Sequence, residues 1–375
     1  MGGESGKRSE GRRRHSWRAM SRRRERAPRS QPPDGPKTDG RGFGIGSKPG
    51  AGEKCGLGIA SRGAEREGGE GALLSTAASR SWRRMRARSA VRVADLLRSG
   101  TARLRAAGVP GAERDAEWLL GAVLGLDRGR LHLAAGDVVS AAKRGCFESW
   151  CGRRGRREPL QYILGSQQFR TCSLQVDSRV LIPRPETERV VDLCLSVHCS
   201  GPMVDLGTGS GAIAISLGLE RPGEDVFATD ISAPALSLAE ENARRAGASR
   251  VFFMQGDLFE PLGTRASDCS LVVCNPPYVA TGELETLAPE VRDWEPRVAL
   301  DGGPDGLDFY RRLAPAAARA MSLGAWIVVE IGAGQRPAVE ALFAATLAFA
   351  ESVTIRDLSG IDRGLGFRRK GGGEE

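Results

Sequence analysis

Met203-Val204-Asp205-Leu206-Gly207-Thr208-Gly209-Ser210-Gly211 predicts a buried strand that ends in a glycine-rich loop and opens a helix. The apolar start is typical of a strand, and the helix is expected over 211–219. Glycines at alternate positions let the backbone turn tightly and approach a ligand closely. Since a plain strand–helix turn has the same composition, the loop alone does not decide between a ligand site and a structural turn.

Strands and helices continue to alternate after this loop. Further strands are predicted at 226–229, 251–254, 271–274, 325–331, 352–356 and 364–369, and helices at 233–246, 306–321 and 336–349. Such alternation requires a mostly parallel sheet with helices on both faces. We therefore predict a Rossmann-like α/β domain with seven strands over 186–375.

A different pattern precedes this domain. Apolar residues at helical spacing, beginning at Val93 and Leu96, predict a small helical bundle over 89–165. Alternation from Phe169 to Ile182 predicts a β-hairpin linker over 166–185 that joins the two domains.

Charge is distributed unevenly along the 375 residues. The net charge of +9 first suggests a nucleic-acid partner, but 1–88 hold 22 Lys/Arg and 9 Asp/Glu, a net of +13, which leaves 33 and 37, a net of −4, for 89–375. The first 88 residues are rich in Arg, Gly, Ser and Pro, so we expect a disordered basic leader. A nucleic-acid-binding arm, a transit peptide and a translation start near Met85 are alternatives.

Composition also limits the class of protein. The eight cysteines form no C-x-x-C pair, and none of the three histidines lies in a recognisable motif, so no metal site is expected. No run of about 18 apolar residues is present, so no membrane span is expected. We expect a cytoplasmic monomer with reduced cysteines.

Carboxylates after the next two strands support a cofactor site. Asp230 ends the second strand, where a carboxylate can accept hydrogen bonds from two ribose hydroxyls, although it or Ser232 can instead cap the next helix. Asp257 is predicted to accept from an adenine amino group, or to be a turn residue. The G-x-G-x-G spacing differs from that of a dinucleotide site. We therefore predict S-adenosyl-L-methionine, which has no pyrophosphate, as the cofactor, bound by Gly207, Thr208, Gly209, Ser210, Gly211, Asp230, Asp257 and Asn275.

Asn275-Pro276-Pro277-Tyr278 follows the strand 271–274 directly and predicts a substrate loop. Proline fixes its own backbone and restricts the preceding residue, so the carbonyls of Asn275 and Pro276 are expected to point outward as acceptors. Two acceptors match the two hydrogens of an –NH2 group, and Tyr278 offers a face for a planar group. We predict Asn275, Pro276 and Tyr278 as catalytic and Asn275 to Tyr278 as substrate-binding residues of an N-methyltransferase. A proline-rich turn is the structural alternative.

These motifs together resemble the HemK/PrmC family of peptide chain release factor N5-glutamine methyltransferases over about 90–370. The more specific segments are Arg157-Glu158-Pro159-Leu160-Gln161-Tyr162-Ile163-Leu164-Gly165, Leu181-Ile182-Pro183-Arg184-Pro185-Glu186-Thr187-Glu188, Glu290-Val291-Arg292-Asp293-Trp294-Glu295-Pro296 and Ala299-Leu300-Asp301-Gly302-Gly303-Pro304-Asp305-Gly306. The resemblance implies a class I S-adenosylmethionine methyltransferase. Its two domains would clamp a release factor whose Gly-Gly-Gln glutamine enters the pocket at Asn275. Some family members carry Trp where Leu258 stands, so the adenine contact here would be aliphatic.

Two other activities use similar loops. A ribosomal-protein glutamine methyltransferase is disfavoured by the intact Pro-Arg-Pro-Glu-Thr-Glu at 183–188. A nucleic-acid N6-adenine methyltransferase must bind a polyanion, which the net charge of −4 over 89–375 disfavours.

Overall fold

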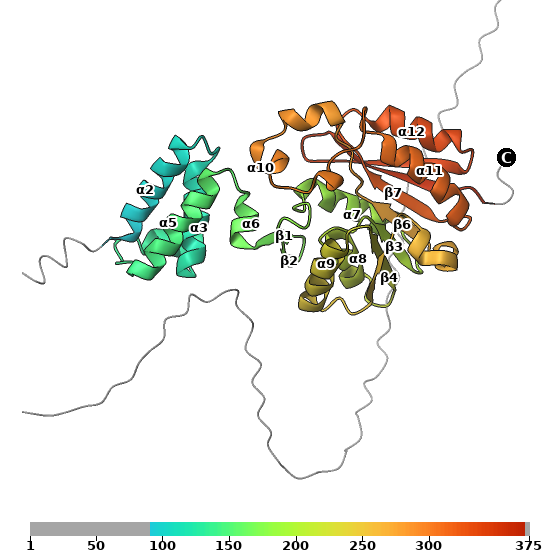
Figure 1. Cartoon of the computed structure of the whole chain (residues 1–375). Helices are drawn as coiled ribbons and strands as arrows, with labels where there is room; N and C mark the ends of the chain where they lie inside the picture. Colours follow the sequence, from blue (N-terminus) through green and yellow to red (C-terminus); the bar gives the residue numbers. More distant parts are fainter. Residues whose placement is uncertain (1–90, 372–375) are drawn as a thin grey trace, which may run out of the picture. The chain divides into compact units, whose positions relative to one another are not determined.

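A computed structural model describes residues 91–371 of the chain (Figure 1). The predictions for 1–88, a disordered basic leader and a start near Met85, concern residues outside this range. Within 91–371, none of the helices is both long and apolar enough to span a bilayer.

The helical bundle predicted for the first described part is confirmed. It consists of α2 (Val93–Ala106), α3 (Ala112–Leu124), α4 (Arg128–Leu133), α5 (Ala141–Gly155) and the short α6 (Leu160–Leu164). Leu104, Leu119, Leu131 and Phe147 are almost fully buried in its core. Gly100 of α2 lies directly against the Phe147 ring of α5, where a Cβ atom would be 2.5 Å from Cζ, so the two helices pack at close range.

The β-hairpin is shorter than predicted. Its strands are β1 (Ser166–Phe169) and β2 (Cys172–Gln175), paired antiparallel, and the following residues to 184 form no strand. Asp177 ends the extended segment, because its side chain accepts a hydrogen bond from the backbone N–H of Arg179 at 3.0 Å and forms a turn. Val180 and Ile182 were predicted in the hairpin, but they are buried in a loop that packs against α9.

The second part contains one seven-stranded sheet in the order β5-β4-β3-β6-β7-β9-β8. Its strands are β3 (Met203–Leu206), β4 (Val226–Asp230), β5 (Val251–Gln255), β6 (Leu271–Cys274), β7 (Trp326–Glu330), β8 (Phe349–Arg356) and β9 (Asp362–Arg369). All neighbouring pairs from β5 to β7 are parallel, whereas β9 pairs antiparallel with β7 and with β8. The predicted mostly parallel sheet of seven strands is confirmed.

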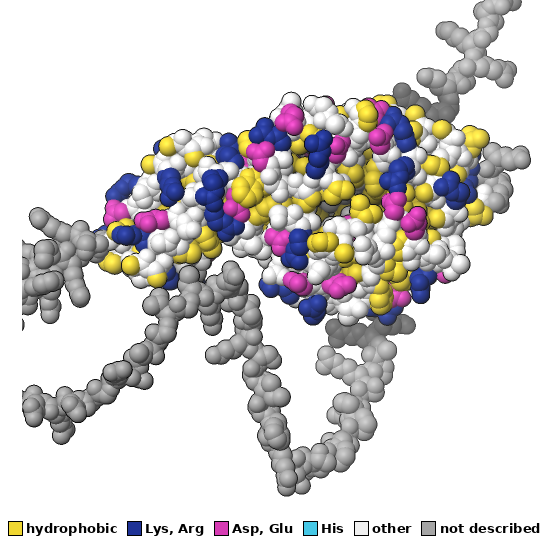
Figure 2. Space-filling view, viewed as in Figure 1, with side chains coloured by type: hydrophobic (Ala, Val, Ile, Leu, Met, Phe, Trp, Pro, Cys, Tyr) yellow, Lys and Arg dark blue, Asp and Glu magenta, His cyan; other side chains and the backbone are white. Residues whose placement is uncertain are grey.

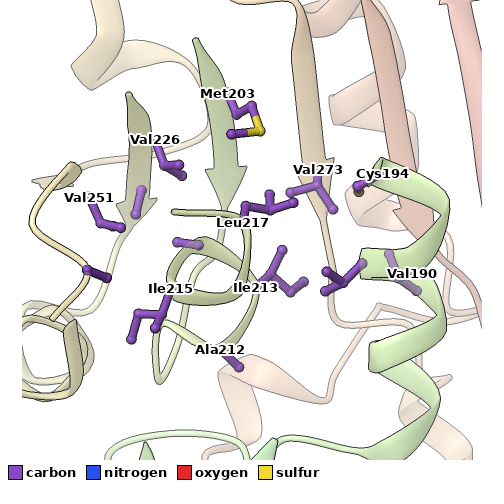
Figure 3. Close-up of a cluster of buried hydrophobic side chains, with 14 of the residues drawn as sticks. Val190, Cys194, Met203, Ala212, Ile213, Ile215, Leu217, Val226, Val251 and Val273 are labelled. Carbon is purple, nitrogen blue, oxygen red and sulfur yellow. The ribbon is translucent and has the colours of Figure 1, made fainter. Parts of the chain in front are cut away.

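Helices cover both faces of this sheet. One face packs against α7 (Pro185–Val197), α8 (Ala212–Glu220) and α9 (Ala233–Ala246), as the side chains in Figure 3 show for α7 and α8. The other face packs against the 3₁₀ segment η1 (Glu260–Asp268), α11 (Asp308–Ala320) and α12 (Arg336–Ala345). Alternate residues of β3, such as Met203 and Val204, enter opposite layers, as the strand period requires.

The last predicted helix, 336–349, is too long by four residues. The helix ends at Ala345, and Leu347 takes a left-handed backbone conformation with φ of 58°. Phe349 therefore begins β8, which starts three residues earlier than predicted.

The segment between β6 and α11 has little regular structure. It contains η2 (Thr281–Thr286), the four-residue α10 (Pro289–Arg292) and η3 (Arg297–Ala299).

Candidate active site

A cavity of about 650 Å³ lies where β3, β4, β5 and β6 end. Residues that follow each of these strands line it, namely Gly207, Ile231, Asp257 and Asn275. The chain order reverses between β3 and β6, because β4 and β5 lie on one side of β3 and β6 on the other. Open α/β sheets bind ligands at such a switch point, so this cavity is the candidate site.

The glycine-rich loop forms the wall after β3. The backbone N–H groups of Gly207 and Thr208 donate to the carbonyl of Thr229 in β4 at 2.8 and 3.0 Å, which fixes the loop on the neighbouring strand. Gly207, Thr208, Gly209 and Ser210 line the cavity. Gly211 does not; its φ of 83° turns the chain into α8, and a Cβ atom there would lie 2.9 Å from Ile215. Its part is therefore in shaping the loop.

Asp230 holds the end of β4 against the loop. One carboxylate oxygen accepts from the backbone N–H of Gly209 and the other from that of Ser232, both at 2.9 Å. Ser232 is the residue that caps α9, because its hydroxyl accepts from the N–H of Ala235 at 3.3 Å. Asp230 lines the cavity, and its carboxylate oxygens can accept further hydrogen bonds there.

Asp205 lies beneath the loop and was not among the predicted ligand contacts. Its Oδ2 accepts from the Thr208 hydroxyl at 2.7 Å and from the N–H of Ala214 at 3.1 Å, while its buried Oδ1 has no partner within 91–371. Burial raises the pKa of this carboxyl to about 7. A cationic ligand in the cavity would favour its ionised form.

The residues predicted to contact the adenine of the cofactor follow β5. Asp257 and Leu258 both line the cavity, and Asp257 forms an ion pair with Arg312 of α11. Leu258 takes a left-handed conformation with φ of 46°, and its carbonyl accepts from the Thr229 hydroxyl at 3.2 Å.

The chemistry of the cavity wall fits S-adenosyl-L-methionine. Apolar side chains, including Ile213, Ile231 and Phe309, line the same cavity as the Asp230 carboxylate. A nucleoside needs an apolar surface for its base and acceptors for its hydroxyls, and a positively charged sulfonium is favoured near carboxylates.

The substrate loop forms the wall after β6. Asn275, Pro276 and Pro277 line the cavity. The side-chain Nδ2 of Asn275 donates to the hydroxyl of Thr187 at 3.3 Å. Among residues 91–371, neither Oδ1 of Asn275 nor the backbone carbonyl of Pro276 accepts a hydrogen bond. Both predicted acceptors are therefore available to a ligand.

Tyr278 is placed differently from the other three residues of the loop. It does not line the cavity, and its hydroxyl donates to Oε1 of Glu330 at 3.3 Å. Burial, and then the charge of Glu330, raise the pKa of Tyr278 far above its usual range. Its predicted stacking on a substrate stays a prediction, whereas its contacts in the structure support the loop from below.

Thr187 and Glu330 are site residues that the sequence did not identify. Thr187 lies in the first turn of α7 and Glu330 at the end of β7, and their exposed fractions are 3% and 1%. The Thr187 hydroxyl donates to Oε2 of Glu330 at 2.6 Å. The sequence held two signals, the segment 181–188 that contains Thr187 and a glutamate at the end of the otherwise apolar strand Trp326-Ile327-Val328-Val329-Glu330.

A second loop supports the backbone of the substrate loop. The N–H of Val279 donates to the carbonyl of Leu300 at 3.0 Å, and that of Gly302 to the carbonyl of Val279 at 2.8 Å. Gly306 has φ of 76°, and a Cβ atom there would lie 2.4 Å from the carbonyl oxygen of Tyr278. The two loops fit together only because glycine occupies this position.

Ion pairs join the helical part to the segment after the substrate loop. Arg154 and Arg157 bind the Glu290 carboxylate of α10 at 2.8 and 2.6 Å, and Arg184 binds Glu295 at 2.6 Å. Burial acts to raise the pKa of Glu290, but the hydrogen bonds from both arginines outweigh it and hold the value at about 2. Three of the four segments that carry the family resemblance therefore meet at 290–295.

Metal binding has no support in the described part of the chain, where no group of three or more His, Cys, Asp or Glu side chains is placed to hold an ion.

Two known domain families match the chain, the PrmC N-terminal domain over residues 95–165 and the methyltransferase small domain over residues 187–290. A release factor glutamine methyltransferase from Geobacter sulfurreducens is 45% identical over 263 residues, 70% of this chain and 91% of that protein. One from Moorella thermoacetica is 44% identical over 273 residues, 72% of this chain and 95% of that protein. Among solved structures, a methyltransferase from Pyrococcus furiosus has a TM-score of 0.39 at 14% identity, over 53% of this chain and 89% of that one.

The domain matches and the strand-end cavity together define an S-adenosyl-L-methionine-dependent methyltransferase. The relatives are matched over more than nine-tenths of their length at over 40% identity. The chain belongs to the release factor glutamine methyltransferase family, so the predicted fold, cofactor and family are confirmed.

Proposed function

We propose that this protein methylates N5, the side-chain amide nitrogen, of the glutamine in the Gly-Gly-Gln loop of a peptide chain release factor. The observation that carries the proposal is a pair of acceptors at the cavity wall, Oδ1 of Asn275 and the carbonyl of Pro276, which accept no hydrogen bond from residues 91–371. The family membership supports the choice of a release factor as the protein that presents this glutamine.

The acceptor pair would compensate for the low nucleophilicity of the substrate's amide nitrogen. An amide nitrogen is a poor nucleophile because its lone pair is delocalised into the carbonyl. Two acceptors that bind its two hydrogens raise the electron density on nitrogen and aim it at the electrophile. Catalysis is then mostly positioning and electrostatic preorganisation.

When bound, S-adenosyl-L-methionine would supply the methyl group from a sulfonium, and its sulfur would keep the bonding electron pair and leave as a neutral thioether. The nitrogen then loses one hydrogen as a proton to solvent. Neither the leaving group nor this late proton loss needs a strong acid or base from the protein.

The cofactor contacts are part of the proposal. Gly207 to Ser210, Asp230, Asp257, Leu258 and Asn275 would hold the cofactor, with Gly211 shaping the loop. Asp230 would bind the ribose hydroxyls, and Leu258 would contact the adenine.

Surface charge favours a protein substrate over a nucleic acid. Figure 2 shows basic and acidic side chains interspersed on the visible face of the described residues. Residues 89–375 carry a net charge of −4, which is unfavourable for a polyanion. We also propose that the protein acts as a monomer in the cytoplasm.

A transfer assay with methyl-labelled cofactor tests the proposal. The full-length protein is offered a release factor, the same release factor with Asn in place of the loop glutamine, a glutamine-containing ribosomal protein, and duplex DNA. Label on the unaltered release factor alone is expected. Label on DNA or on the ribosomal protein, with none on the release factor, would overturn the proposal.

A further inference from the structure

Three side chains form a hydrogen-bonded row beneath the substrate loop. Asn275 donates through Nδ2 to the Thr187 hydroxyl at 3.3 Å, and Thr187 donates to Oε2 of Glu330 at 2.6 Å. They come from three separate places in the chain, namely the loop after β6, the first turn of α7 and the end of β7.

The direction of these bonds follows from the donors available. A carboxylate only accepts hydrogen bonds, and both oxygens of Glu330 face hydroxyl donors, Thr187 on one side and Tyr278 on the other. The single proton of the Thr187 hydroxyl is therefore committed to Glu330. Toward Asn275, Thr187 presents only lone pairs.

An asparagine side chain has two nearly identical orientations, related by a half turn, that exchange its oxygen and its –NH2 group. Next to an acceptor, only the orientation with Nδ2 toward Thr187 forms a hydrogen bond. That orientation leaves Oδ1 of Asn275 for the cavity. The opposite orientation would point an N–H donor at the N–H donors of a substrate amide.

We propose that Thr187, whose proton is held by Glu330, is a positioning residue that fixes the side-chain amide of Asn275 with its oxygen toward the substrate. This inference rests on the proposed function, since it assigns how the acceptor of that reaction is oriented. It also gives a task to the segment 183–188, which leads into α7 and whose Pro183 and Thr187 line the cavity.

A structural role for Thr187 is the competing explanation, because the residue is buried between α7 and β7. The two explanations differ in what valine does. Thr187→Val keeps the size and branching of the side chain but lacks the hydroxyl, whereas Thr187→Ser keeps the hydroxyl but loses a methyl group. If Thr187 has a structural role, the variant that keeps its shape, Thr187→Val, should remain active. If Thr187 positions Asn275, the variant that keeps its hydroxyl, Thr187→Ser, should remain active.

The experiment measures kcat, KM for the release factor, cofactor Kd and the unfolding temperature for wild type, Thr187→Val and Thr187→Ser. We expect kcat of Thr187→Val to fall about tenfold, the factor for one hydrogen bond at the upper end of its usual range, with cofactor Kd unchanged. Thr187→Ser is expected to retain most of the wild-type kcat. Ser216→Ala is the matched control, because it removes a buried hydroxyl of α8 whose one hydrogen bond within the described residues is to the carbonyl of Ala212.

Wild-type kcat in Thr187→Val, or an equal loss in Thr187→Ser, would overturn the inference. If Thr187→Val does not fold, Thr187→Ala replaces it, and a kcat equal to that of Thr187→Ser would count against the hydroxyl. Failure of the wild type to methylate any release factor would instead contradict the proposed function, so the two failures are distinguishable.

Discussion

The two halves of the cavity are held in place by contacts of different range. In the cofactor half, Asp230 bonds Gly209, 21 positions away, across the neighbouring strands β3 and β4. In the substrate half, Asn275 depends on Thr187, 88 positions away, and Tyr278 on Glu330, 52 positions away. The β3 and β4 ends of the cofactor half thus form when the sheet forms, although its Asp257 also pairs with Arg312 of α11. The substrate half needs α7, β7 and the 300–306 loop. Damage to each half is therefore expected to affect a different measurement.

The largest effect is expected from Asn275→Ala in the substrate half. The substitution removes one of the two acceptors, and loss of one preorganised polar group typically lowers kcat by roughly 10²- to 10³-fold. Cofactor affinity is expected to stay close to that of the wild type. Calorimetric titration with the cofactor and a single-turnover transfer assay measure the two quantities. If Asn275→Ala lost as much cofactor affinity as Asp230→Ala, the assignment of Asn275 to the substrate half and of Asp230 to the cofactor half would be contradicted.

Asp230→Ala is expected to give the converse result. It removes a charged acceptor from the cavity and leaves the N–H groups of Gly209 and Ser232 without their partner. Hydrogen bonds to charged groups contribute about 1.5–3 kcal/mol, so cofactor affinity is expected to fall about 10- to 100-fold, with kcat at saturating cofactor largely kept. Asp225→Ala is the control, because Asp225 precedes the same strand at its opposite end and pairs with the half-exposed Arg250. An equal loss in both variants would contradict the assigned role.

Gly306→Ala tests the support of the substrate loop. The new methyl group would meet the carbonyl of Tyr278 in a backbone conformation that alanine avoids, so we expect a destabilisation of about 1–3 kcal/mol and a lower kcat. Cofactor affinity is expected to be unchanged. Gly324→Ala is matched to it, since Gly324 has φ of 83° but no atom within 4 Å of a Cβ, so it isolates the backbone cost of about 1 kcal/mol. Thermal unfolding and transfer assays on both variants separate the cost of the steric clash at residue 306 from the cost of the backbone conformation alone.

The smallest expected effect is a pH dependence that arises at Glu330. Burial raises the pKa of this carboxyl to about 7, against the hydrogen bonds from Thr187 and Tyr278 and the charge of Arg363, while Glu186 raises it further. Only the ionised form must accept the Thr187 proton. We therefore expect kcat to fall to about half at pH 7, the ionised fraction of such a group, and to level off at lower pH near the about tenfold loss expected of Thr187→Val.

Comparison with Glu330→Gln isolates this effect, because Asp205 also titrates near pH 7. In Glu330→Gln, the fall of kcat toward acidic pH is expected to be smaller than in the wild type. An unchanged dependence of kcat on pH would exclude Glu330 as the source of that fall. Stability moves in the opposite sense. The raised pKa means that the folded state binds the proton more tightly than the unfolded state. Ionisation therefore lowers the free energy of unfolding as pH rises from about 4.5 to about 7.

The same difference in range explains what the sequence could predict. Gly207 and Asp230 stand in local patterns, at the ends of apolar strands, and the strands themselves were predicted to within a few residues. Asn275 was predicted for the same reason. Nothing local places Thr187 under Asn275, because that contact depends on how α7 crosses the ends of β6 and β7.

Boundaries were missed where side chains, and not periodicity, end an element. The Asp177 turn ends the hairpin early, and the left-handed Leu347 ends α12 before the predicted residue. The placement of Tyr278 away from the cavity has a similar origin. Its hydroxyl finds a buried carboxylate from a distant strand, which no pattern within residues 275–278 indicates.

The proline that follows Asn275 affects the chemical stability of the Asn275 side chain. Asparagine side chains in proteins deamidate slowly. The backbone nitrogen of the next residue attacks the side-chain carbonyl carbon and closes a cyclic imide with loss of ammonia, and water later opens this imide to aspartate. The nitrogen of Pro276 carries no hydrogen and is already bonded to its ring, so this imide cannot form at Asn275. The side-chain amide of Asn275 is thereby protected from turning into a carboxylate, whereas the other asparagine of the sequence, Asn242, is buried in α9.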